Sequence, residues 1–448
     1  MNVYPVDASD LGNRSYVVTD GVAAIAIDPP RPPTGVIDIV KAHGLALEMV
    51  ADTHLHNDHI SGGPELAVLT GASHAVSANE NVRGARGLVD GEQFEVGTMR
   101  VDVVATPGHT RHHQAFVVTQ GNRCAVFTGG SLLVGSVGRT DLLGADMAEA
   151  LAGEQWFSVR SLLESLSRKA AVHPTHGFGS FCSSTPATTT ESTIGIERRV
   201  NPAALLDRET FVKTLLDGFG EFPSYFAHMA ELNQAGFVPP ANRDPAPALS
   251  NHEVADLAAH TWVVDVRRRA EFADGHIPGT VNIGLDGPFA TYLGWTMPWG
   301  SDFVLVAGDE NELSRARLAL AHIGLDTPVG EAIPDATALT GRLRRATFDE
   351  LAAEWTDEVA VIDVRRREEW NTGHLEGAHH LPLHRLSESE LPSGRLWLYC
   401  AAGYRAMLGA SLLQRTGRDV VAIDGPWSGA TEVGLPISTA QPPCRIEP

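Results

Sequence analysis

The side chains best suited to bind a metal ion are gathered in one short run. Residues 54–59 follow the pattern H-x-H-x-D-H, with three imidazoles and one carboxylate: His54, His56, Asp58 and His59. Imidazole is a common ligand for zinc and iron, and this alternation matches neither a helix face nor a plain strand face. The run follows the apolar stretch 45–52, so it predicts a ligand-bearing loop at the end of a strand.

Two more histidines close segments of the kind that line a metal site. His109 lies in the run Thr106-Pro107-Gly108-His109-Thr110, and His176 lies in Pro174-Thr175-His176-Gly177. Either one alone would more often be an ordinary surface or core histidine. Together with the run at 54–59 they indicate a metal centre.

In this order, the H-x-H-x-D-H, T-P-G-H-T and P-T-H-G motifs make the chain similar to the metallo-β-lactamase superfamily. The runs Gly138-Arg139-Thr140-Asp141 and Ser192-Thr193-Ile194-Gly195 narrow the resemblance to the persulfide dioxygenase branch and its near relative glyoxalase II. The resemblance covers about residues 1–240. It implies an αββα sandwich with a metal at one edge.

The chain departs from this branch at one metal ligand. In the family, the strand after the T-P-G-H loop ends in Thr-Gly-Asp, and the aspartate binds the metal beside two histidines, as in a facial triad. Here the run is Thr128-Gly129-Gly130, so Gly130 stands where the aspartate is expected. The resemblance therefore carries over His54 and His109 without their carboxylate.

Three outcomes are compatible with this loss. We favour a face of three histidines, in which His56 joins His54 and His109. Asp141 reaching in from the next loop is the second outcome, and loss of the metal is the third. Because the missing residue would bridge two metals, we expect one metal per chain, Fe(II) favoured over Zn(II), and at best a weak second site from Asp58, His59 and His176.

Two further residues are candidates for the substrate pocket. Cys182 lies six positions after His176 in a Gly-Ser-x-Cys run that resembles some dioxygenase–rhodanese fusions, where it could take or relay sulfur. The alternative is a buried or incidental thiol. Arg139 either contacts an anionic substrate tail or braces Asp141.

The second half of the chain repeats itself. Residues 264–272 recur as 362–370 and residues 275–279 recur as 373–377, an offset of 98 positions. A repeat of that length is a whole small domain, and its strand–helix alternation predicts a parallel sheet covered by helices. Four prolines within 237–247 predict an extended linker before it. We expect domains at 1–240, 248–336 and 344–440.

The second copy carries a reactive-cysteine loop. The run Cys400-Ala401-Ala402-Gly403-Tyr404-Arg405 follows an apolar strand and precedes a helix, so backbone N–H groups, the helix dipole and Arg405 would stabilise a thiolate. Such a thiolate is a nucleophile. A buried structural cysteine is the alternative.

Both copies resemble rhodanese domains, through the D-V-R pattern, the G-H pattern and, in the second copy, the Cys-x-x-Gly-x-Arg loop. The resemblance implies sulfur transfer through a Cys400 persulfide. In the first copy Ala307 stands at the place of the cysteine, and acidic residues follow it. We expect this copy to be a structural spacer or docking surface.

Composition excludes several classes of function. The net charge is −21, which disfavours nucleic acid and anionic membranes as partners because no large positive field is present. No run of about 18 apolar residues could span a bilayer. The N-terminus shows no secretory signal, and four cysteines in 448 residues do not form a disulfide framework. We expect a cytoplasmic protein.

The sequence thus predicts an α/β enzyme with an N-terminal metallo-β-lactamase-like αββα sandwich and two rhodanese-like, doubly wound parallel-sheet domains. The resemblance implies that oxygen converts a low-molecular-weight thiol persulfide to sulfite at the metal, and that Cys400 passes sulfur to a thiol or sulfite acceptor. A zinc thioester hydrolase and a metal-free persulfide carrier are the alternatives. The thiol, the direction of sulfur flow and the oligomeric state, a homo-oligomer included, stay open.

Overall fold

The computed structural model describes residues 1–183, 191–236, 245–356, 359–388 and 390–439. By its internal contacts the chain divides into two compact units. The first is Met1–Ala241 with Leu318–Leu325, and the second is Asn242–Arg317 with Asp326–Pro448. Most of the predicted linker, residues 237–244, lies outside the described residues. No helix in the described ranges is long and apolar enough to cross a membrane.

The N-terminal unit contains two six-stranded sheets. The first has the order β1-β2-β3-β4-β5-β6, made of Asn2–Ala8, Asn13–Thr19, Ala23–Ile27, Ala46–Ala51, Ser73–Ser77 and Arg86–Leu88. The second has the order β14-β13-β10-β9-β8-β7, made of Ser192–Thr193, Ala171–Pro174, Arg123–Gly129, Gln114–Gln120, Met99–Ala105 and Gln93–Val96. The short strands β11 (Leu132–Leu133) and β12 (Ser136–Val137) form a separate hairpin.

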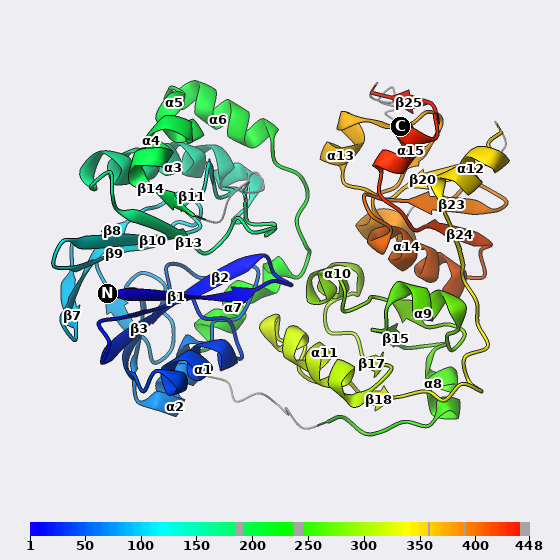
Figure 1. The fold of residues 1–448 in the computed structure, drawn as a ribbon, viewed down its shortest axis with the longest axis horizontal. Coiled ribbons are helices and arrows are strands. Elements are labelled where there is room, and N and C mark those ends of the chain that lie inside the picture. The colour runs from blue at the N-terminus through cyan, green and yellow to red at the C-terminus, as the bar shows by residue number, and fades with distance from the viewer. Residues whose placement is uncertain (184–190, 237–244, 357–358, 389, 440–448) are drawn as a thin grey trace. The chain divides into compact units, whose positions relative to one another are not determined.

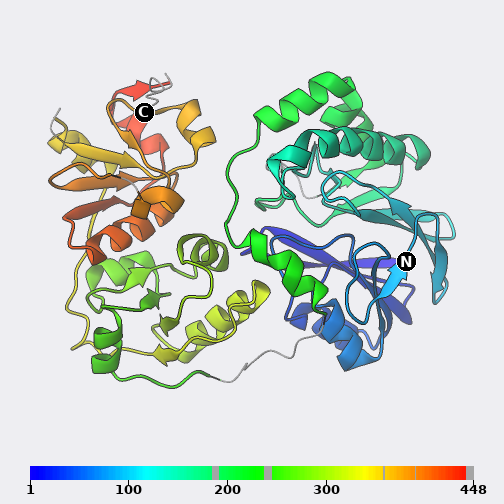
Figure 2. The same cartoon turned by 180° about the vertical axis from the view of Figure 1, so that it is seen from behind.

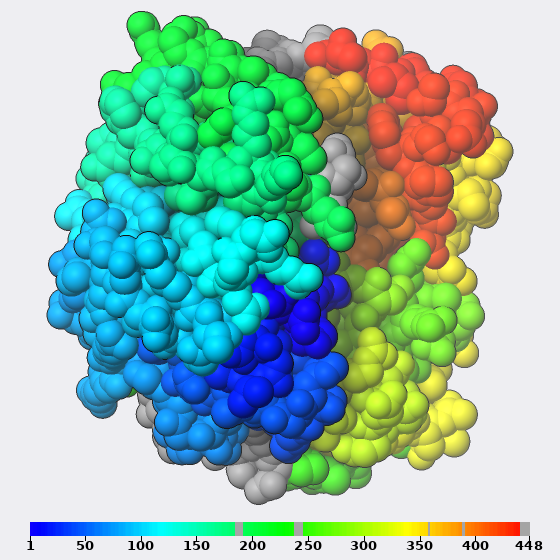
Figure 3. Space-filling model, turned by 60° about the vertical axis from the view of Figure 1, so that its left-hand side comes forward, coloured from blue at the N-terminus to red at the C-terminus, as the bar shows by residue number. Residues whose placement is uncertain are grey.

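Helices cover the outer faces of the two sheets (Figure 1). On the first sheet lie α1 (Thr34–Ala42) and α2 (Gly63–Thr70), and on the second lie α3 (Ala145–Ser165), α4 (Ile194–Val200), α5 (Pro202–Leu205) and α6 (Arg208–Asp217). A further helix, α7 (Phe226–Gln234), follows them. In the space-filling view this unit, drawn blue through green, has a continuous surface (Figure 3).

Apolar packing explains the layers. Side chains from one face of each sheet, such as Ile25 and Phe116, form the core between the sheets. The opposite faces pack against helices, as Val126 does in a cluster with Val159 of α3. The predicted αββα sandwich is therefore confirmed. The histidine-bearing segments follow β4, β8 and β13, so the ends of these strands position the metal site.

The first repeat copy is a four-stranded parallel sheet of order β16-β15-β17-β18. Its strands are Val281–Asn282, Trp262–Asp265, Phe303–Val306 and Gly330–Ala332, and its helices α8 to α11 are Asn251–Leu257, Arg269–Asp274, Phe289–Thr296 and Glu310–His322.

The second copy is a five-stranded parallel sheet of order β19-β24-β23-β20-β22. Its strands are Arg344–Ala346, Val420–Ile423, Leu396–Tyr399, Ala360–Asp363 and His379–His380, and its helices are α12 (Phe348–Glu354), α13 (Arg367–Thr372), the 3-10 helix Leu383–Glu388, α14 (Tyr404–Arg415) and α15 (Ser428–Glu432). Seen from behind, its strands lie side by side with helices on their faces (Figure 2). A small antiparallel pair, β21 (His374–Leu375) and β25 (Ile437–Ser438), completes it.

The repeated D-V-R motif is a structural element. In the second copy, Nε of Arg365 lies 3.0 Å from both carboxylate oxygens of Asp363, and Nη2 donates to the Gly373 carbonyl at 2.6 Å. Arg267 makes the same contacts with Asp265 in the first copy. Both pairs are buried. The motif therefore recurs because each copy ties the end of one strand, β15 or β20, to the C-terminal end of the helix that follows it.

We expect Asp363→Ala to lower the free energy of unfolding of the second copy by about 3–5 kcal/mol, because it leaves the Arg365 guanidinium buried without its partner. Urea unfolding measures the effect. Asp419→Ala is the control, since it breaks an exposed pair with Arg395 and costs at most about 1 kcal/mol. Equal losses for the two variants would contradict a structural role for the buried pair.

Candidate metal centre and sulfur-transfer site

Three histidines from three different loops converge in the N-terminal unit. One ring nitrogen each of His54, His109 and His176 lies within 4.8 Å of the other two. All three side chains are buried. His54 follows β4, His109 follows β8 and His176 follows β13, so the arrangement depends on strand ends from both sheets.

The ring of His54 is oriented by a buried carboxylate through a hydroxyl. Thr53 Oγ1 donates to Asp28 Oδ2 at 2.8 Å, and the same hydroxyl lies 2.8 Å from Nδ1 of His54. Because the Thr53 proton is directed to Asp28, the hydroxyl accepts from His54 Nδ1–H. The lone pair of His54 is therefore on Nε2, which faces the other two histidines.

The same logic fixes the other two rings. His109 Nδ1 lies 2.7 Å from the Arg139 carbonyl oxygen, which can only accept. His176 Nδ1 lies 2.9 Å from Oδ1 of Asn13, whose amide group donates to Asp58 and leaves this oxygen as the acceptor. Both imidazoles thus carry their proton on Nδ1 and direct the Nε2 lone pair inward.

Burial keeps these imidazoles neutral. It lowers the pKa of His109 to about 4 and that of His176 to about 3, and it also lowers the pKa of His54 well below its usual value. Neutral imidazole is the form that binds a metal. The pocket therefore presents three lone pairs and no competing proton at neutral pH.

The spacing and the donor set fit a transition-metal ion. Nε2 of His54 and Nε2 of His176 lie 3.3 Å apart, and metal–nitrogen bonds of 2.0–2.1 Å give about that separation in a tetrahedral site. Nε2 of His109 is buried and has no hydrogen-bond partner among the described residues. Two acceptor nitrogens facing each other, with a third orphaned beside them, suit a cation between them.

The remaining residues of the H-x-H-x-D-H run lie next to this group. His56 Nε2 is 3.3 Å from Oδ1 of Asp28. His56 also belongs to two further groups of side chains that could hold a metal ion, one with Asp28 and His54 and the other with Asp58 and His176. His59 Nδ1 lies 2.9 Å from Asp58. The structure thus brings His176, which the sequence assigned to a second site, together with His54 and His109.

No carboxylate in the described part of the chain belongs to the group of His54, His109 and His176. Asp141 makes a two-pronged ion pair with Arg139, at 2.7 and 2.8 Å. Arg139 also donates to the carbonyls of Phe181 and Gly220. Arg139 thus braces Asp141, and its contact with an anionic substrate stays a prediction.

Cys182 is fully buried near the same pocket. Its backbone N–H bonds to Ser180 Oγ at 3.1 Å, and its carbonyl accepts from the Arg139 N–H at 2.9 Å. Burial, together with the nearby Asp58 carboxylate, raises the pKa of the Cys182 thiol well above its usual value. As arranged here, this cysteine carries a protonated thiol.

Asp28, Thr53 and Asn13 are the positioning residues that the sequence did not reveal. Asp28 accepts from Thr53 and Thr175 and lies at the end of β3 with a positive φ of 51°. A carboxylate directly after a fully buried strand was the available signal. Asn13 gave none, since it reaches His176 across 163 positions of sequence.

Cys400 lies at the end of β23, where the sequence placed it. It is buried, and the Gly403 N–H donates to its sulfur at 3.1 Å. Arg405 donates from Nη1 and Nη2 to the two oxygens of Glu369, both at 2.6 Å. Burial would raise the pKa of Glu369, but these bonds lower it well below its usual value, so the pair is charged.

The first copy replaces this arrangement with a self-contained acidic loop. Ala307 follows β17 as Cys400 follows β23, and Glu312 lies five residues later, as Arg405 does. The Glu312 carboxylate accepts from the Gly308 N–H at 2.8 Å, so a side chain of the loop caps its own backbone. This loop therefore has no nucleophilic cysteine, and its Gly308 N–H group is already bonded to a carboxylate and not open to an anionic substrate.

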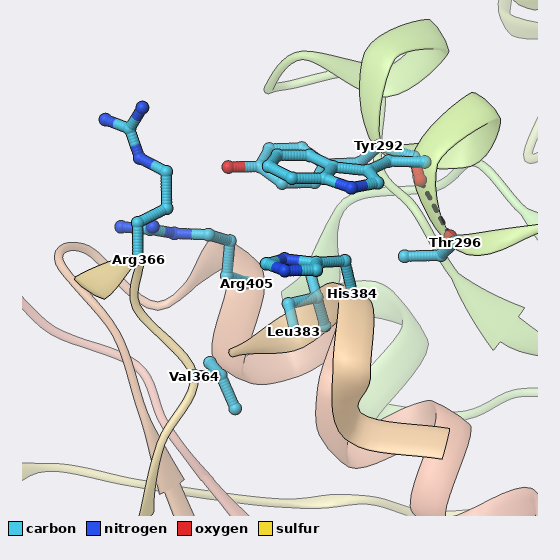
Figure 4. A pocket seen from close by; sticks show the side chains of 8 residues that line it. Tyr292, Thr296, Val364, Arg366, Leu383, His384 and Arg405 are labelled. Atoms are coloured by element: carbon cyan, nitrogen blue, oxygen red, sulfur yellow. Dashed lines mark hydrogen bonds between the residues drawn. The ribbon is translucent and has the colours of Figure 1, made fainter. Parts of the chain in front are cut away.

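The first copy nevertheless contributes to the pocket at the second copy's loop. A small pocket is lined by Tyr292, Trp295 and Thr296 of α10 and by Val364, Arg366, Leu383, His384 and Arg405 of the second copy. Figure 4 shows Tyr292 and Thr296 across the pocket from Leu383 and His384, with Arg366 and Arg405 to one side. Trp295 stacks on His384, with ring centroids 4.6 Å apart. The cysteine-less copy therefore forms one wall of this pocket.

Comparison with known proteins identifies both halves. The metallo-beta-lactamase superfamily model matches residues 15–177, and the rhodanese-like domain model matches residues 250–330 and 347–432. The human mitochondrial persulfide dioxygenase ETHE1 is 30% identical over 207 residues, which are 46% of this chain and 73% of the human protein. The chain belongs to the persulfide dioxygenase family. It is an enzyme of that family fused to a rhodanese-like pair.

Further persulfide dioxygenases, a hydrolase and a solved structure are also similar to the chain. The chain spans 64% of the bovine and of the mouse ETHE1 proteins, at 30% and 28% identity. A probable hydroxyacylglutathione hydrolase of Schizosaccharomyces pombe is 27% identical over 45% of this chain and 86% of that protein. A solved metallo-beta-lactamase structure from Staphylococcus aureus has a TM-score of 0.65 at 26% identity, covering 74% of this chain and 98% of that one. The predicted family and domain types are confirmed.

We expect one metal ion per chain, because the three candidate ligand groups among the described residues overlap: His54, His56 and His176 each belong to two of them. Removal of an outer-shell partner typically weakens metal binding by about 10-fold or more. Because His176 is a proposed direct ligand, His176→Ala should weaken metal binding by more than about 10-fold. His56→Ala, beside the same pocket, should weaken it less. Elemental analysis and metal titration check this. Two tightly bound ions per chain, or a larger loss in His56→Ala, would contradict it.

Trp295→Ala should lower kcat/KM for sulfur transfer by about tenfold, as expected for roughly 1.4 kcal/mol of lost transition-state binding. The substitution removes part of the wall that the copy without a cysteine contributes to the pocket beside Arg405 of the Cys400 loop. Val329→Ala changes an exposed side chain of the same copy and should leave transfer unchanged. If both variants matched the parent protein, the first copy would not act in sulfur transfer.

Proposed function

We propose that the chain is a sulfur-metabolising enzyme that oxidises a low-molecular-weight thiol persulfide with oxygen in its N-terminal domain and transfers sulfur through Cys400. The observation that carries the first activity is the convergence of three imidazole lone pairs whose protons are all held on the opposite nitrogen. The family membership supports the choice of substrate. A reducing compartment such as the cytoplasm suits the free Cys400 thiol.

The proposed ligands of the metal are His54, His109 and His176, with His176 in place of the initially favoured His56. Iron is favoured by family resemblance, with zinc as the alternative. When bound, the metal would act as a Lewis acid and hold the persulfide sulfur beside oxygen. Asp28, Asn13 and the Arg139 carbonyl orient the three rings, which is the contribution of the protein itself.

The overall oxidation balances with one oxygen molecule and one water. The terminal sulfur of the persulfide is oxidised to sulfite, its S–S bond breaks, oxygen is reduced, and the thiol is released. Burial of the three histidines excludes bulk water from the pocket. That exclusion would protect the persulfide from competing reactions before oxidation.

The second proposed step is a thiol–sulfane exchange at Cys400. The thiolate attacks the outer sulfur of a donor and forms a Cys400 persulfide, while the donor leaves as a thiolate or as sulfite. An acceptor thiol or sulfite then attacks the outer sulfur, and the Cys400 thiolate is regenerated. The Gly403 N–H donates to this sulfur, and the Arg405–Glu369 pair lies in the same loop region.

A thioester hydrolase is the second candidate, favoured by the similarity to the Schizosaccharomyces pombe hydrolase. Purification without oxygen, followed by counts of iron and zinc per chain, separates the candidates. Iron together with oxygen uptake on a thiol persulfide supports the dioxygenase. Zinc together with thioester cleavage supports the hydrolase. A metal-free protein with persulfidated Cys400 would reduce the function to sulfur carriage.

Cys400→Ser should abolish thiosulfate–cyanide sulfur transfer and leave oxygen uptake with a thiol persulfide unchanged, because the two reactions use different domains. Cys124→Ser, at a half-buried thiol of the N-terminal domain, serves as the control and should retain both activities. Loss of both activities in Cys400→Ser would show that the division of labour is wrong.

A further inference from the structure

An imidazole ring fills the space at the position where the family has its metal-binding aspartate. An ideal Cβ built on Gly130 would lie 2.1 Å from Cδ2 and 2.4 Å from Nε2 of His109. Real Cβ atoms do not approach other atoms so closely. Gly130 does not have the positive φ that favours glycine, so this ring, and not the backbone conformation, prevents a side chain there.

The His109 ring cannot easily move away. Its Nδ1–H donates to the Arg139 carbonyl at 2.7 Å, and its backbone N–H donates to Oε1 of Gln155 at 2.8 Å. On its other side, an ideal Cβ on Gly138 would lie 2.7 Å from His109 Nδ1. Two glycines thus enclose the ring, one hydrogen bond fixes the ring itself, and a second fixes the backbone of His109.

The absence of a side chain at the neighbouring Gly129 leaves room for a second imidazole, that of His113. Gly129 has a φ of +52°, and its ideal Cβ would lie 2.5 Å from Nε2 of His113. The Gly130 N–H donates to that same nitrogen at 3.0 Å, and Nδ1 of His113 lies 2.7 Å from Oγ1 of Thr106. Since Nε2 accepts, its lone pair is used by the turn and is not directed to the metal group.

His113 therefore joins the turn to the metal pocket. It is buried, and its ring stacks on that of His54 with centroids 4.9 Å apart and planes 28° apart. One side of the ring supports a proposed ligand, and its edge holds the backbone of Gly130.

We propose that the Gly129–Gly130 turn, His109 and His113 form one unit that completes the metal site with an imidazole in the volume that a carboxylate side chain would need. Gly130 is then required by the site, and His113 is a positioning residue for the turn and for His54. The inference rests on the proposed metal function. It implies that restoring aspartate at position 130 weakens metal binding.

Anaerobic titration of the full-length, metal-free chain with Co(II), followed by its visible spectrum, tests this directly. Gly130→Asp and Gly130→Ala should each bind Co(II) at least about 10-fold more weakly than the parent chain, with an altered spectrum. Gly218→Ala is the control, because Gly218 is exposed, has a φ of −88° and offers ordinary contact distances. Equal or tighter binding by Gly130→Asp would overturn the proposal.

Variants at His113 test the positioning role. His113→Ala removes the acceptor for the Gly130 N–H and should weaken Co(II) binding by about 10-fold or more. His113→Gln, whose amide oxygen can accept that N–H, should recover most of the affinity and the parent spectrum. His112→Ala, at the adjacent half-buried residue, is the control. No loss in His113→Ala, or no rescue by His113→Gln, would overturn this role.

Thermal unfolding of the metal-free chains separates this inference from the proposed function. If the parent chain bound no Co(II), the metal function would fail, but the packing argument would still be tested. Gly130→Ala should then lower the Tm of the N-terminal domain more than Gly218→Ala does. Equal Tm values for these two variants would overturn the packing argument whether or not metal binds.

Discussion

The N-terminal domain depends on the burial of three neutral imidazoles whose lone pairs face one another. Buried acceptors without donors are costly, and two acceptor nitrogens 3.3 Å apart repel each other unless a proton or a cation lies between them. The scaffold fixes this arrangement with Thr53, Asn13 and a carbonyl oxygen, each placed to take the opposite N–H. A metal ion bound by the three nitrogens would explain why the protein orients all three rings in this way.

The two rhodanese-like copies show how one scaffold supports opposite roles. Both contain the buried Asp–Arg pair that ties the end of β15 or β20 to the end of the following helix. They differ at the loop, where the second copy has Cys400 and Arg405 and the first has Ala307 and Glu312. The first copy has no cysteine at this position and supplies Tyr292 and Trp295 to the pocket of the second.

Motifs predicted the fold and the segments that converge at the candidate site, because their order along the chain reflects strand ends that meet at one edge. They could not rank His56 against His176, since that choice depends on which ring nitrogen each side chain turns inward. For His176 this is decided by Asn13, 163 positions away. The consequence of Gly130 could not be predicted either. The sequence shows a glycine in place of the aspartate, but it does not show that the His109 ring occupies the volume of the absent side chain.

Anomalous X-ray diffraction at the iron edge, from crystals grown and loaded with Fe(II) without oxygen, tests the proposed metal centre most directly. We expect a single strong peak in the N-terminal domain, bonded to Nε2 of His54, His109 and His176 and to no protein carboxylate. A pocket without a peak, or an ion held by Asp58 and His59 instead, would contradict it.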